Sequence, residues 1–279
     1  MKRALVKKEL LEAFAWVYRN RKTGKPHPVW KSVALTSLYC VAFAFLMHKI
    51  YEIARTLCLP MMEQDLQWLF LALMGLASLS VASLSNVFHA YAAVCRLQEE
   101  RGQPNEPKLV SASLRAKLTS TYLMGLFYSL IFMVPAIIVH LQYAPPSALG
   151  MVLTLCIPLL LGALVLVFSC VIAYFVIAVT KRIRNKNILT VILSGAFLGG
   201  YYYLFEKSQD IYAAVLENAA LVAWWTKRLC YPFYHMGLGA QGSFLSAIIF
   251  VMFVLLVIGV ALLLIWKSYN IRIRGENRE

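Results

Sequence analysis

Polar side chains that could do chemistry fall into three groups along this chain. Asn86 and His89 lie one helical turn apart within a long apolar run, and polar groups buried in such surroundings often mark a pathway for ions or substrates. The other two groups are charged clusters between apolar runs, where a partner protein can dock. The first comprises Glu99, Glu100, Arg101, Asn105 and Glu106, and the second comprises Lys181, Arg182, Arg184 and Lys186.

Each of these groups also has a structural interpretation. Asn86 and His89 can simply pair with a neighbouring helix near the end of a span. The segment 96–117 contains a Gly-Gln-Pro-Asn-Glu-Pro stretch followed by the helix-compatible residues 111–117, which is also what an ordinary solvated loop looks like. The sequence alone leaves both interpretations open.

Motifs of common enzymes are missing from the sequence. It has no GxxxxGK[ST] phosphate loop, no HExxH and no GxSxG, and its five histidines are scattered. The six cysteines form no CxxC pair and have no metal-ligand spacing, although Cys58 and Cys230 fall on the same predicted side. We therefore expect no catalytic residues, no metal and no cofactor, and we do not expect this chain to be an enzyme by itself.

The elements that position these groups follow from the distribution of charge. Residues 32–48, 66–95, 118–180, 187–205 and 229–266 contain no Asp, Glu, Lys or Arg, and the composition is 61% hydrophobic and only 14% charged. A soluble domain of 279 residues needs charge over its whole surface, whereas about 20 apolar residues suffice for a helix to cross a bilayer. The chain is therefore predicted to be a polytopic membrane protein.

We predict an all-α fold with six transmembrane helices. Before them, residues 4–18 have the pattern of an amphipathic helix lying in the interface, followed by a basic, proline-containing stretch. The chain then divides into a cytoplasmic arm (1–31), a transmembrane domain (32–266) and a basic cytoplasmic tail (267–279). The expected spans are about 32–50, 66–94, 118–141, 148–180, 188–205 and 243–266.

The connections between the spans also have distinct patterns. Residues 51–65 are expected to form an outer loop, and two prolines at 145–146 predict a tight hairpin. Span four, with 33 residues, is too long for a bilayer and must tilt, bend near Pro158 or project from it. Within the long connection 206–242, residues 211–225 predict a helix that lies against the outer interface or against other spans, anchored by Trp224 and Trp225. Residues 231–239 predict an irregular aromatic-glycine segment.

The basic residues set the orientation. Of the 27 Lys and Arg residues, 22 fall on the side that holds the arm, the loops 96–117 and 181–187 and the tail. By the positive-inside rule, both termini are predicted to be cytoplasmic in a multi-pass protein of the cell membrane. The net charge of +14 is explained by this topology and by anionic lipid, so no nucleic-acid partner is expected.

The chain resembles the membrane subunit, or permease, of an ABC-2-type exporter. The matching features, in order, are an interfacial helix, six spans, a cytoplasmic loop after span two and a partly embedded outer segment before span six. Residues 181–205, which run from the basic loop into Ile-Leu-Thr-Val-Ile-Leu-Ser and end in Tyr-Tyr-Tyr-Leu-Phe, resemble the loop and span five of an ABC exporter family from Gram-positive bacteria. Members with this stretch contain two six-span halves. The resemblance therefore implies that this chain corresponds to one half and pairs with a second, identical or different.

The resemblance also implies a mechanism of alternating access. A separate nucleotide-binding subunit would hydrolyse ATP and push on the 96–117 loop, with a further contact at 181–187. Two other classes stay open on the residues alone. One is an ATP-independent carrier or channel, and the other is a non-transport membrane protein such as an assembly or immunity factor.

Overall fold

The computed structural model describes residues 6, 11, 18, 25–99, 107–180, 195, 199–200, 202–203 and 206–276. This part of the chain is helical almost throughout and contains no strand, which confirms the all-α prediction. The interfacial helix expected at 4–18 and the span expected at 188–205 lie outside the described residues, apart from isolated positions.

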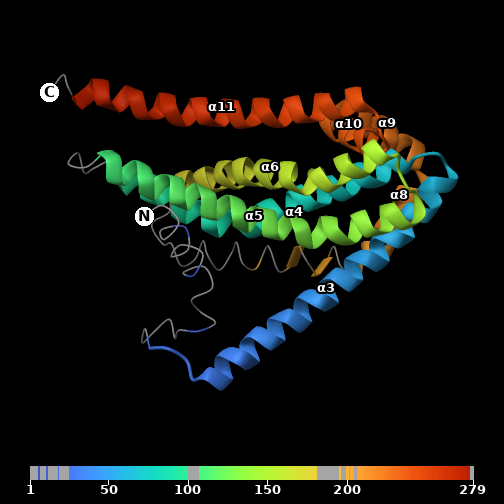
Figure 1. Ribbon diagram of the computed structural model, residues 1–279, viewed down its shortest axis with the longest axis horizontal. Coiled ribbons are helices and arrows are strands. Elements are labelled where there is room, and N and C mark those ends of the chain that lie inside the picture. Colours follow the sequence, from blue (N-terminus) through green and yellow to red (C-terminus); the bar gives the residue numbers. More distant parts are fainter. Residues whose placement is uncertain are drawn as a thin grey trace.

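Five of the described helices are long and apolar enough to cross a membrane. Figure 1 shows them as long rods, with the short helices gathered at one end and the carboxyl end of α11 at the other. Their bounds are α3 Val29–Glu63, α4 Gln67–Glu99, α5 Pro107–Tyr143, α6 Ala148–Thr180 and α11 Phe244–Glu276. These helices match five of the six spans that the charge-free runs predict.

The core is a bundle of α4, α5 and α6, which make the most extensive contacts with one another. Small residues allow these helices to approach closely. A methyl group on Gly162 of α6 would lie 3.2 Å from the backbone of Leu126 on α5, and one on Gly125 of α5 would lie 2.9 Å from Val165 on α6. Lipid is as apolar as a leucine side chain, so close packing of this kind, rather than water exclusion, holds membrane helices together.

The turn between α3 and α4 corrects the expected outer loop at 51–65. Helix α3 continues through Pro60 to Glu63, and only Gln64 to Leu66 connect it to α4. Asp65 has a φ of 56°, and the Leu66 N–H donates to the Met61 carbonyl at 2.8 Å, as in a Schellman end. The charges at 52, 55 and 63 therefore belong to the helix, because an apolar face that includes Leu57 and Met61 is buried against the bundle.

The expected hairpin between spans three and four is confirmed. Helix α5 ends at Tyr143 and α6 begins at Ala148. The Ser147 Oγ accepts from the Gly150 N–H at 3.2 Å, so this serine caps the first turn of α6. Helix α6 then continues without interruption through Pro158 to Thr180.

Three short helices occupy the long connection before the last span: α8 Ser208–Glu217, α9 Ala219–Leu229 and α10 Tyr231–Ala240. Two expectations were wrong here. The helix expected over 211–225 is broken at Asn218, and the segment expected to be irregular is α10. Helix α10 forms because its glycines face neighbours: Gly237 packs on the Trp68 backbone of α4 and Gly239 on Ala247 of α11.

Helices α3 and α11 are the loose flanks of this assembly. The buried residues of α3 all lie in its second half, from Ile50 to Met61, and the first half leaves Phe45 63% exposed. In α11, the described buried side chains lie between Ser246 and Val254, whereas Leu263 is 63% exposed. Figure 1 shows α3 diverging from the bundle toward its amino end.

Candidate functional site

The buried polar side chains of the bundle form a seam between α4 and its two neighbours. On α4, Ser78 meets Ser129 of α5, with the two Oγ atoms 3.2 Å apart. Further along α4, the Ser83 carbonyl accepts a hydrogen bond from Ser169 Oγ of α6 at 3.1 Å. Hydrogen bonds between spans of this kind stabilise membrane bundles modestly and fix how the helices are rotated.

Asn86 lies at the next position of this seam, toward the carboxyl end of α4. Its side chain is completely buried, and its Nδ2 donates to the Thr121 carbonyl of α5 at 3.1 Å. Its Oδ1 is also buried and has no hydrogen-bond partner among the described residues. An amide oxygen can accept two hydrogen bonds, so this atom is a free acceptor inside the bundle.

His89 follows Asn86 by one helical turn on α4 and is partly buried. The bond from Asn86 to Thr121 agrees with pairing to a neighbouring helix. The intramembrane polar site proposed for Asn86 and His89 stays a prediction.

A small groove lies beside the seam, between α4 and α6. Its volume is about 270 Å³. Ser83 lines this groove, and the buried Ser83 Oγ has no hydrogen-bond partner in the described part of the chain. No titratable side chain lines this groove, so it offers apolar contact and hydroxyl groups but no acid or base. The lining residues are Leu79, Ser80, Ser83, Leu84, Phe168 and Ile172.

A second polar cluster, at the end where the short helices lie, was missed by the sequence reasoning. His140 of α5 is 1% exposed, and its ring lies close to the Ala240 carbonyl of α10, although neither ring nitrogen forms a hydrogen bond of normal geometry with the described residues. Nearby on α6, Thr154 Oγ1 donates to the Ala240 carbonyl of α10 at 3.4 Å. The sequence did contain a signal for this cluster, because His140 is a histidine inside the charge-free run 118–180. A histidine inside such a run is also what singled out His89.

His235 of α10 lies in an aromatic setting at this end of the bundle. Its ring stands 4.4 Å from that of Tyr231 and 5.1 Å from that of Tyr234, centroid to centroid. Burial lowers the pKa of His235 below its ordinary value, because the charged imidazolium loses its hydration there. This side chain therefore favours the neutral state.

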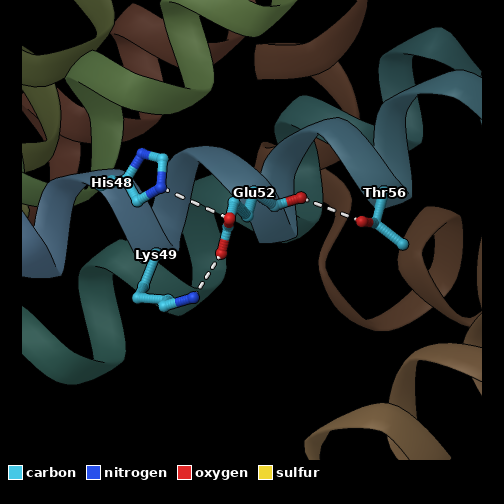
Figure 2. Close-up of polar contacts among 4 residues, drawn as sticks. All are labelled: His48, Lys49, Glu52 and Thr56. Carbon is cyan, nitrogen blue, oxygen red and sulfur yellow. Dashed lines mark hydrogen bonds and ion pairs between the residues drawn. The ribbon is translucent and has the colours of Figure 1, made fainter.

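Charged groups of α3 neutralise one another locally, as Figure 2 shows for four residues of this helix. Glu52 lies 2.7 Å from Lys49 Nζ and 3.4 Å from His48 Nε2, and Thr56 Oγ1 donates to the Glu52 carbonyl at 2.9 Å. All these contacts are within one exposed helix face. Such pairs contribute little to stability, and they assemble no pocket.

Most of the charged residues proposed to contact a partner lie outside the described residues, although 107–117 of the first loop form the start of α5. Glu99 is the last residue of α4, with only its backbone described, and the side chains at 100, 101, 105 and 106 lie outside the described residues. The same holds for the basic loop 181–187. Their proposed roles stay predictions.

Metal and disulfide chemistry find no support in the described residues. In this part of the chain, no group of three His, Cys, Asp or Glu side chains is close enough together to hold a metal ion. Cys58 and Cys230 are both free thiols, and Cys58 is buried. The seam, the groove and the His140 cluster consist of hydroxyl, amide and imidazole groups set among apolar side chains.

Comparisons with known proteins add no assignment. Neither protein-family profiles, curated proteins nor solved structures give a match to this chain.

Proposed function

We propose that this chain is the membrane-spanning permease subunit of an ATP-driven exporter of the ABC-2 type, with ATP hydrolysed by a separate nucleotide-binding subunit. The main support is the position of α8, α9 and α10. These three short helices lie directly before the last long helix and gather at one end of the bundle, with α10 packed on α4, α6 and α11. The resemblance implies a partly embedded segment at this point in the chain.

The lack of charge within the apolar runs also favours an external source of energy. A carrier coupled to protons commonly uses a carboxylate within the membrane. The charge-free runs of this chain hold no Asp or Glu, and the seam consists of hydroxyl and amide groups. In the proposal, force reaches the spans through the loop after α4, where Glu99, Glu100 and Glu106 meet the ATPase, and through the basic loop at 181–187.

The exposed first half of α3 supports the second expected partner, which is another six-span permease half. A permease half of this class pairs with another six-span half, and α3 leaves large apolar side chains uncovered over its first half. The proposal places the pair in the cell membrane, with both termini in the cytoplasm.

The first experiment tests the ATPase. The tagged chain is purified from its own membranes in mild detergent, and the expected result is co-purification of a Walker-A protein together with ATP hydrolysis. Glu99→Lys combined with Glu100→Lys should reduce that hydrolysis by about thirtyfold without lowering the amount of inserted chain, because a charge contact across an interface costs about 2 kcal/mol or more when broken. Glu217→Lys, at the exposed end of α8, is the matched control.

Two outcomes would contradict the proposal. One is repeated purification of the chain without any ATPase while transport persists, which would favour an ATP-independent carrier or channel. The other concerns topology. Alkaline phosphatase fused at the carboxyl terminus should be inactive and fused after Asp65 should be active, and the reverse pattern would invert the proposed orientation.

A further inference from the structure

Helix α9 has two faces of different character. Its inner face consists of small residues, with Ala219, Ala223 and Thr226 buried against the rest of the protein. Its outer face carries large apolar side chains, namely Leu221, Trp224, Trp225 and Leu229, which are 43 to 72% exposed. Exposed tryptophans on an amphipathic helix are typical of the interface between membrane and water.

Two cations lie at the carboxyl end of this helix, among aromatic rings. The Lys227 Nζ lies 5.4 Å from the centre of the Trp68 ring and 5.5 Å from that of Tyr234. The Arg228 guanidinium stands 4.4 Å from the centre of the Trp224 ring. The rings hold both charges at the depth of the tryptophans, because cations are attracted to the faces of aromatic rings.

These two charges lack an acidic counterpart. Among the described residues, neither Lys227 nor Arg228 forms an ion pair with a carboxylate, whereas Lys207 at the same end pairs with Asp210 at 3.0 Å. Two uncompensated positive charges at interfacial depth attract a diffuse negative group. Lipid phosphates lie at this depth, and a guanidinium can bind two phosphate oxygens at once.

We propose that the α9 cluster, formed by Trp224, Trp225, Lys227 and Arg228, binds the headgroup phosphate of an anionic phospholipid in the leaflet at this end of the bundle. Lys227 and Arg228 contact the phosphate, and the outer apolar face of α9 lies against the acyl chains of the same lipid. This inference does not depend on the proposed exporter function.

The experiment measures tryptophan quenching by brominated lipids. The full chain is placed in bilayers of phosphatidylcholine that contain small amounts of brominated phosphatidylglycerol or brominated phosphatidylcholine. All six tryptophans emit together, so the quantity compared between variants is the preference for the anionic lipid. We expect a clear preference in the wild type and a loss of about fivefold for each charge removed in Lys227→Gln and Arg228→Gln, since each basic residue contributes about 1 kcal/mol near an anionic surface.

Control variants keep the result interpretable. Lys207→Gln should retain the wild-type preference. Arg228→Lys, which keeps the charge but loses the two-oxygen contact of the guanidinium, should lose less of the preference than Arg228→Gln does. Equal preference in the wild type and in the Lys227→Gln/Arg228→Gln double variant would overturn the proposal. Loss of the preference on adding inorganic phosphate at constant ionic strength would also overturn it, because the ligand would then be free phosphate and not a lipid.

Discussion

The α4–α5–α6 bundle and the flanking helices α3 and α11 are all apolar, but they are packed very differently. Helix α11 contains the most apolar stretch of the five candidate spans and α4 one of the least apolar, yet α4 is the most buried and α11 is largely exposed. Overall apolarity therefore does not decide which helix lies inside. In lipid, small residues and interhelical hydrogen bonds decide it.

A pair of glycine substitutions tests this comparison with the largest expected effect. Gly237→Ala should destabilise the protein by about 3 kcal/mol, because the new methyl group would overlap the Trp68 carbonyl oxygen, a backbone atom that cannot move aside easily. Gly259→Ala in α11 is the matched control, since nothing lies within 4 Å of its added methyl group. Unfolding in mixed micelles measures both, and equal losses would show that the contact of α10 with α4 is no tighter than the surroundings of α11.

Leucine-to-alanine substitutions test whether stability depends on how tightly a side chain is packed or only on its being apolar. Leu161→Ala in α6, whose side chain is fully buried, should cost about 2 kcal/mol through lost contacts and the cavity left behind. Leu256→Ala in α11, which is 63% exposed, should cost less than about 0.5 kcal/mol because lipid fills the space. The same unfolding measurement applies, and a large loss at Leu256 would show that α11 is covered by protein.

The seam hydrogen bonds should have a smaller effect. Ser169→Ala removes the bond to the Ser83 carbonyl and should lower stability by about 0.6 kcal/mol, the average for such bonds between membrane helices. Thr36→Val on α3 removes a bond of similar length, but one within its own helix, and should have no measurable effect. If the two variants behave alike, the seam contributes nothing specific.

The smallest expected effect concerns pH. Burial lowers the pKa of His235 in the folded protein, so below a pH of about 6.5 the unfolded chain binds more protons at this site than the folded chain does. Stability should therefore fall as the pH drops through that value. His235→Gln should flatten the decline, which thermal unfolding measured across this pH range would detect. If stability still declines at low pH in His235→Gln, then other titratable groups cause the decline.

The sequence predicted the long helices well because an apolar run of more than 20 residues has few alternatives. It failed where local signals conflicted with packing. Pro60 and the charges near it indicated a loop, yet the buried face with Leu57 and Met61 keeps α3 helical. Gly237 and Gly239 indicated an irregular segment, yet both are needed for α10 to approach its neighbours.

The seam was beyond the reach of sequence reasoning for a different reason. Its partners are far apart in the chain, with Ser78 and Ser129 separated by 51 positions and Ser83 and Ser169 by 86. A serine in an apolar run is unremarkable until the neighbouring helix is known. Asn86 was identified correctly as a buried polar residue, but only the structure assigns its amide to the Thr121 carbonyl.

The length of α5 gives the bundle a mechanical property. A helix of 37 residues measures roughly 55 Å, far more than the hydrocarbon layer of roughly 30 Å. Helix α5 must therefore tilt or extend beyond this layer, and because it packs along α4 and α6, any tilt of α5 is shared by the bundle. Gly125 and Gly162 allow α5 and α6 to approach closely, so a tilt of one of these helices would be transmitted to the other through this contact.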